Sequence, residues 1–231
     1  MGVCELDIIG LVYAILWFVI AGLSITFSVI FFMRYPKAEF PRTRYTYLVN
    51  AIFFLLIGAT KLFDLLFVNM AAEAEPIPLF PIFTEDVLHY LALVEMTIFL
   101  SGYAVLIFFL ERYFVKTYYL LTFLPIVAIC VAWIFNIDMF IPDLMQLDIF
   151  GTESTFTLIF YACRVVVPLV YLYVAIKSTG VIRKTSIALF FGYALIATFY
   201  VRHPEYWALV TPPLMVIGFY LVYWGYLKRR E

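Results

Sequence analysis

Five ionisable side chains stand inside long apolar stretches of the sequence: Lys61, Asp64, His89, Glu95 and Arg164. A charged group in a lipid interior costs about 2.5–3.5 kcal/mol even on insertion scales, so each of these residues is a candidate functional group. The guanidinium of Arg164 offers a bidentate fork that suits an anion. Lys61 and Asp64 are three residues apart, on one face of a helix, and their charges compensate. This chemistry suits a small zwitterionic or anionic ligand.

The spacing predicts a common depth for three of these groups. Lys61, Glu95 and Arg164 each lie nine residues from the expected outer end of their apolar stretch. At about 1.5 Å per residue, all three are expected about 13 Å below the outer edge. We therefore expect an outward-opening polar pocket at this level. The further expected lining residues are Asp64, His89, Tyr90 and Trp207.

Two other interpretations of the same residues remain open. In the first, Lys61 with Asp64 and Glu95 with Arg164 form structural ion pairs that specify how the helices pack. In the second, Glu95 or Asp64 carries a proton in a transporter. The sequence alone does not decide among these interpretations and the ligand pocket.

The elements that carry these residues follow from the composition. The chain has 231 residues, of which 66% are hydrophobic and 13% charged, with a mean hydropathy of +1.03. Ordinary soluble domains are about 45–50% apolar and about 25% charged, so the excess must face lipid. Seven apolar stretches are long enough to span a bilayer as helices: 7–33, 45–70, 86–113, 117–136, 155–177, 183–202 and 204–227. We expect a single all-α domain of seven transmembrane helices.

Charges between the stretches predict the orientation. Twelve of the fifteen basic residues fall on one side: Arg34, Lys37, Arg42, Arg44, Arg112, Lys116, Lys177, Arg183, Lys184, Lys228, Arg229 and Arg230. The loops on the other side are mostly acidic. By the positive-inside rule the N-terminus is outside and the C-terminus cytoplasmic, as expected of a multi-pass protein of the cell membrane.

Several classes of function lack their sequence signals. The chain has no CxxC, HExxH, GxGxxG, Walker A or GxSxG motif, so we expect no metal, no cofactor and no enzymatic activity. The composition excludes a nucleic-acid module. A retinal protein would carry a lysine inside its seventh helix, and the stretch 204–227 has none, so we do not expect a retinal protein.

Aromatic residues gather near the ends of the stretches, where they predict interfacial belts facing the lipid headgroups. These residues are Tyr45, Tyr47, Tyr118, Tyr119, Tyr223 and Trp224.

Short motifs carry two resemblances. Glu111-Arg112-Tyr113 resembles the acidic-Arg-Tyr motif of rhodopsin-like G-protein-coupled receptors, although the chain lacks the third-helix disulfide cysteine and the Asn-Pro-containing seventh helix of that family. The segments 60–64, 110–117 and 180–185, about a tenth of the chain, are similar to uncharacterised archaeal seven-helix membrane proteins and to seven-helix sensor regions of prokaryotic kinases. The second resemblance implies a sensory role without an established ligand.

The expected function is therefore a receptor-like membrane sensor in signal transduction. A small polar or zwitterionic ligand would bind the outer pocket, and a separate cytoplasmic transducer would contact Glu111, Arg112, Arg183 and Lys184. The alternatives are a small proton- or ion-coupled transporter and a non-catalytic subunit that binds other membrane subunits. Measurable flux would indicate the transporter, and stoichiometric copurification would indicate the subunit.

Overall fold

The computed structural model describes residues 3–63, 65, 85–115, 117–135, 152–199 and 210–227, and every regular element within them is a helix. The helices are α1 (Val3–Arg34), α2 (Pro41–Phe63), α4 (Glu85–Tyr113), α5 (Leu120–Phe135), α6 (Thr152–Lys177), α7 (Gly180–Phe199) and α9 (Thr211–Tyr226). For these residues, the prediction of an all-helical fold is thus confirmed.

The apolar stretches form helices because a helix satisfies its backbone hydrogen bonds within the segment, as an apolar environment requires. Within the described residues, five segments are long and apolar enough to cross a membrane: Ile15–Arg34, Pro41–Phe63, Tyr90–Tyr113, Ile159–Lys177 and Gly180–Thr198. The apolar segment Leu120–Ile134 of α5 is shorter. Large apolar side chains also lie on the surface, among them Ile134 and Ile176, which are 74% and 71% exposed. Length, composition and surface together indicate a multi-pass membrane protein.

The helix ends differ from the predicted boundaries where prolines stand. α2 begins at Pro41, four residues before the predicted stretch, because proline at a first helical position loses no intrahelical hydrogen bond. α9 begins at Thr211 with prolines in its first turn, for the same reason. Residues 204–209 of the predicted last stretch lie outside the described residues.

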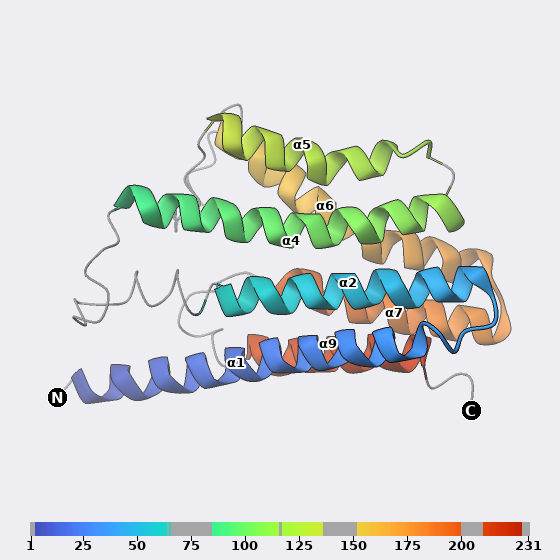
Figure 1. Cartoon of the computed structure of the whole chain (residues 1–231), viewed down its shortest axis with the longest axis horizontal. Coiled ribbons are helices and arrows are strands. Elements are labelled where there is room, and N and C mark those ends of the chain that lie inside the picture. Colours follow the sequence, from blue (N-terminus) through green and yellow to red (C-terminus); the bar gives the residue numbers. More distant parts are fainter. Residues whose placement is uncertain are drawn as a thin grey trace.

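The helices pack in a ring that follows the sequence order. Each helix contacts the next one along the chain among those described, α9 closes the ring against α1, and α4 also contacts α6. In Figure 1, α1, α2, α4 and α5 form the nearer layer, with α9, α7 and α6 behind them. Successive helices alternate in direction.

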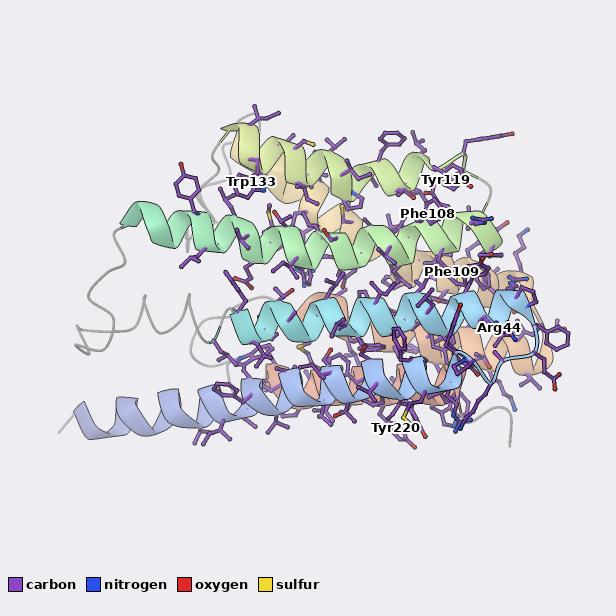
Figure 2. The ribbon with its side chains drawn as sticks, viewed as in Figure 1. Arg44, Phe108, Phe109, Tyr119, Trp133 and Tyr220 are labelled. Atoms are coloured by element: carbon purple, nitrogen blue, oxygen red, sulfur yellow. The ribbon has the colours of Figure 1, made fainter. Side chains whose placement is uncertain are left out.

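This alternation brings the described basic segments together at one end of the ring. We call it the basic end, and its cations are Arg34, Lys37, Arg42, Arg44, Arg112, Lys177, Arg183 and Lys184. Figure 2 labels Arg44 at this end, beside the turn between α1 and α2.

Small residues permit close backbone contact on one side of the ring. A Cβ added at Gly58 of α2 would lie 2.8 Å from Ile25 Cγ1 and 3.2 Å from the Ala21 carbonyl oxygen on α1. Similarly, a Cβ at Gly192 of α7 would lie 2.9 Å from the Gly218 carbonyl oxygen on α9. Only glycine fits at such distances, so these positions fix the registers of α1 with α2 and of α7 with α9.

Aromatic side chains help to hold α5 against α4 at the edge of the ring. Phe108 of α4 stacks on Tyr119 just before α5, with 5.2 Å between ring centroids. At the other end of α5, Trp133 Nε1 donates to Thr97 Oγ1 of α4 at 2.9 Å. Figure 2 shows these aromatic side chains between the two helices.

Candidate functional site

Lys61 is buried between α1 and α2. Its side chain is only 4% exposed, and Nζ lies 4.5 Å from the centre of the Trp17 ring on α1. An ammonium group over an indole face is attracted by the ring quadrupole, most strongly where water is excluded. This contact holds the cation in the part of the bundle that lies away from the basic end.

Arg164 is buried between α4 and α6. Its side chain is 2% exposed, and its guanidinium carbon lies 5.5 Å from the ring centres of both Phe160 and Tyr161. The hydroxyl group of Tyr103 on α4 interacts with the same guanidinium. A buried, planar cation with a phenol beside it is a suitable anchor for a carboxylate.

The helix registers separate these cations along the bundle. A Cβ at Gly102 would lie 3.4 Å from Leu56 Cβ, and because α2 and α4 are antiparallel, this contact brings Lys61 within one turn of the level of Glu95. α4 and α6 are parallel, and Phe99 packs on Phe160 at 5.7 Å.

The Tyr103–Arg164 contact then extends the same register of α4 with α6. It puts Arg164 about 12 Å nearer the basic end than Glu95, or roughly two helical turns. Along the bundle, Lys61 and Glu95 therefore lie at nearly the same level, and Arg164 lies nearer the basic end. Relative to these contacts, the first residue of α4 lies further from the basic end than the first residue of α6. Equal residue counts from the two helix starts therefore do not give equal levels along the bundle.

The other predicted pocket residues are described only in part. Glu95 is half-buried on α4, and Tyr90 is exposed on the same helix. His89 belongs to α4, but its side chain is outside the described part of the structure, as are Asp64 and Trp207 altogether. Within the described residues, Lys61 and Arg164 lie in two different helix interfaces.

A second buried polar system, made of neutral groups, lies nearer the basic end. Asn50 of α2 accepts a hydrogen bond from the Tyr193 hydroxyl of α7, and its Nδ2 donates to the Thr46 carbonyl at 2.7 Å. The Tyr226 hydroxyl of α9 bonds to that of Tyr171 on α6 and also interacts with Asn50 and Tyr193. We call Asn50, Tyr171, Tyr193 and Tyr226 the Asn–Tyr network; it joins four helices.

A line of packed rings connects Arg164 to this network. Tyr103, which contacts Arg164, packs edge-on against Phe53 of α2 with 5.3 Å between centroids. Phe53 packs edge-on against Tyr193 at 5.7 Å, and Tyr193 stacks on Tyr171 at 5.4 Å and 3°. Consecutive side chains from α6, α4, α2 and α7 thus form one continuous path.

The path ends at a cavity of about 310 Å³ at the basic end. The cavity lies among α2, α6, α7 and α9, and Tyr171 and Tyr226 of the network form part of its wall. Its full lining is Thr43, Thr46, Tyr47, Phe114, Tyr171, Val174, Ile182, Thr185, Ser186, Leu189, Gly225 and Tyr226. These residues supply hydroxyl groups and aromatic faces, and no formal charge.

Glu111, one of the predicted partner-contact residues, caps α5. Its carboxylate accepts hydrogen bonds from the backbone N–H groups of Leu121 and Thr122, both at 2.8 Å, and from the hydroxyls of Thr117 and Thr122. A carboxylate at a helix N-terminus satisfies donors that have no intrahelical partner.

Glu111, the acidic residue of the Glu111-Arg112-Tyr113 motif, thus has a structural role in the cap of α5, and its side chain is buried. The exposed members of the predicted contact set are Arg112, Arg183 and Lys184.

Comparison with known proteins assigns no family. No protein-family model, curated protein or solved structure matches this chain. Its function is therefore inferred from the geometry and chemistry of these residues.

Sequence reasoning missed the Asn–Tyr network and the cavity. Asn50 is an uncharged amide inside an apolar stretch, and such amides are a recognised sign of contact between membrane helices. Tyr47 was predicted in an interfacial belt, but it is 4% exposed and lines the cavity. Tyr45, Tyr118, Tyr119 and Trp224 are exposed, as a belt requires. Tyr223, the remaining predicted member, is half-buried and packs on Phe27. No sequence signal distinguishes Tyr47 from Tyr45.

Proposed function

We propose that this chain is a seven-span protein of the cell membrane that acts as a receptor-like sensor. The N-terminus lies outside, and the basic end faces the cytoplasm, as the positive-inside rule requires. The alternation of helix directions supports this orientation because it gathers eight described cations at one end. The exposed Arg112, Arg183 and Lys184 then face a separate cytoplasmic transducer.

Arg164 is the proposed anchor of the ligand. A buried guanidinium in the middle of an apolar helix is costly, and such groups in membrane proteins characteristically serve binding or transport. Its fork suits the carboxylate of a small polar or zwitterionic ligand. Glu95 and Lys61 add charges of both signs further from the basic end, on the outer side from which we propose that the ligand enters.

The observation that carries the proposal is the line of rings from Arg164 to the Asn–Tyr network. Coupling between distant sites travels through packed elements that both sites can bias. A ligand that displaces Arg164 and Tyr103 moves Phe53 and Tyr193 with them. Those residues belong to α2 and α7, two of the helices whose ends form the basic-end cavity.

The test measures binding and coupling separately. The protein is reconstituted in nanodiscs and titrated with amino acids and small carboxylates, and the unfolding temperature is recorded. We expect at least one compound to raise this temperature in the wild type and to have no effect on Arg164→Met. Arg112→Met, which removes an exposed arginine, is the matched control and retains the response.

Coupling is read from spin labels at Arg44→Cys and Lys184→Cys, with the native cysteines replaced by alanine. The active compound is expected to change the distance between the labels. Phe53→Leu keeps apolar volume but removes a ring of the path, so it should preserve binding and reduce the distance change. An equal thermal response in Arg164→Met would refute the ligand site. If the reconstituted protein carried the compound into liposomes, the chain would be a transporter rather than a sensor.

A further inference from the structure

The cavity at the basic end has the composition of a small-molecule site rather than of a packing defect. Its walls combine aromatic faces from Phe114 and Tyr171 with hydroxyl groups from Thr46, Thr185 and Ser186. Ligand sites typically join an apolar lining to a few placed polar groups, in volumes from about 300 Å³ upward. A purely apolar void would offer a ligand no orienting contact, and this cavity offers several.

The volume limits what can enter. A cavity of about 150 Å³ binds benzene, so about 310 Å³ accommodates a fused two-ring compound. An α-helix with its side chains is about 10–12 Å across, and one turn of it exceeds this space. The size therefore selects a small planar molecule over a peptide helix of a partner protein.

A cation, Arg42, lies next to one wall of the cavity. The Arg42 guanidinium carbon lies 4.6 Å from the ring centre of Phe114, a lining residue, and Arg42 also donates to the Tyr113 carbonyl at 3.1 Å. The carboxylate of Glu111 at the same end is engaged in the α5 cap. The lining itself is uncharged, and the eight described cations of the basic end outnumber the exposed carboxylate of Glu39 there, so the potential favours a negative group over a positive one.

We infer that this cavity binds a planar two-ring aromatic anion, with its rings against Phe114 and Tyr171 and its acidic group at Arg42. The hydroxyls of Thr185 and Ser186 orient the ring edges. This site is separate from the ligand site proposed at Arg164. In nanodiscs both faces of the protein are open to solution, so binding here does not depend on membrane orientation.

Isothermal titration with 2-naphthoate tests the inference, with empty nanodiscs as the blank and the neutral 2-naphthamide as the matched probe. Wild-type protein should bind the carboxylate more tightly than the amide. Arg42→Gln should weaken naphthoate binding by about tenfold, since a charge-assisted pair is worth about 1.5–3 kcal/mol and a tenfold loss corresponds to 1.4 kcal/mol. Affinity for the amide should stay unchanged. Arg44→Gln, which removes an equal charge at the same end, should have little effect.

Two variants locate the site in the cavity. Ser186→Leu fills it from a buried position, and Ile182→Trp narrows it from an exposed one, so the second variant tests the inference if the first fails to fold. Both should abolish naphthoate binding. Unchanged binding in Ser186→Leu or Ile182→Trp, equal affinity for acid and amide, or no wild-type binding would overturn the inference.

Discussion

The bundle contains two buried polar systems, one made of cations and the other of neutral groups. Away from the basic end, Lys61 and Arg164 are cations held against aromatic rings in separate helix interfaces. Near the basic end, Asn50 and its tyrosine partners are neutral groups bonded to one another across four helices. A neutral network stabilises the packing it bridges, because its donors meet acceptors without the desolvation penalty of an ion.

The two systems point to different roles: the neutral network to the packing of the fold, and the buried cations to function. Buried charges are weak evidence of stability and strong evidence of a site, whereas a satisfied neutral network is evidence of defined packing. The network is therefore expected to hold the helices together, and the cations to interact with something that enters. Substitutions in each system test this distinction.

The largest loss of stability is expected at the glycine that holds α2 against α1. α2 carries Asn50 of the Asn–Tyr network and the buried cation Lys61. Gly58 lies on α2 between Asn50 and Lys61, in close contact with Ile25 and Ala21. Gly58→Leu forces α1 and α2 apart, and overpacking in a tight core costs about 3 kcal/mol of unfolding free energy. Denaturant unfolding in detergent measures the loss.

The control for this substitution is Gly22→Leu on α1. Gly22 is exposed, and a Cβ there meets nothing within 4 Å. It should change stability by less than about 0.5 kcal/mol, as is usual for surface substitutions. Equal losses in both variants would show that the close contact at Gly58 does not determine the packing of α2.

An intermediate effect is expected from breaking the Asn–Tyr network. Asn50→Leu removes the bonds to Tyr193, Tyr226 and the Thr46 carbonyl, and it leaves buried hydroxyls without that partner. The expected loss is about 2 kcal/mol of unfolding free energy. Because the residues act together, the Asn50→Leu/Tyr193→Phe double variant should lose less than the sum of the single losses. Strict additivity in the thermal or chemical unfolding data would contradict a network.

The sequence predicted what depends on composition and local periodicity. Long apolar stretches predicted the helices, and the cost of charge in lipid selected Lys61 and Arg164, both of which are buried in the structure. The burial of Glu111 in a cap did not follow from its motif, because its partners Leu121 and Thr122 depend on how the chain turns after α4.

Register and partner choice could not be predicted in this way. The level of Arg164 relative to Glu95 depends on how far α4 extends beyond α6, which is set by contacts such as Phe99 with Phe160. Tyr47 and Tyr45 have the same residue type two positions apart, and helix rotation alone makes one buried and the other exposed. Such long-range geometry leaves no mark in a single sequence.

The smallest effect on stability is expected from removing a buried charge. Arg164→Met keeps a long apolar side chain against Phe160 and Tyr161 and removes the desolvation penalty of the guanidinium. The buried hydroxyl of Tyr103 loses its guanidinium partner, which costs about 1 kcal/mol, and the removed desolvation penalty offsets part of this loss. The unfolding free energy should therefore fall by about 1 kcal/mol or less. If Arg164 were instead half of a structural ion pair, its loss would strand a buried carboxylate and cost about 3–5 kcal/mol. Denaturant unfolding of Arg164→Met beside Asn50→Leu therefore decides between a site and a structural pair. A loss at Arg164 larger than that at Asn50 would assign the cation to the fold, whereas a small loss together with abolished ligand response would assign it to binding.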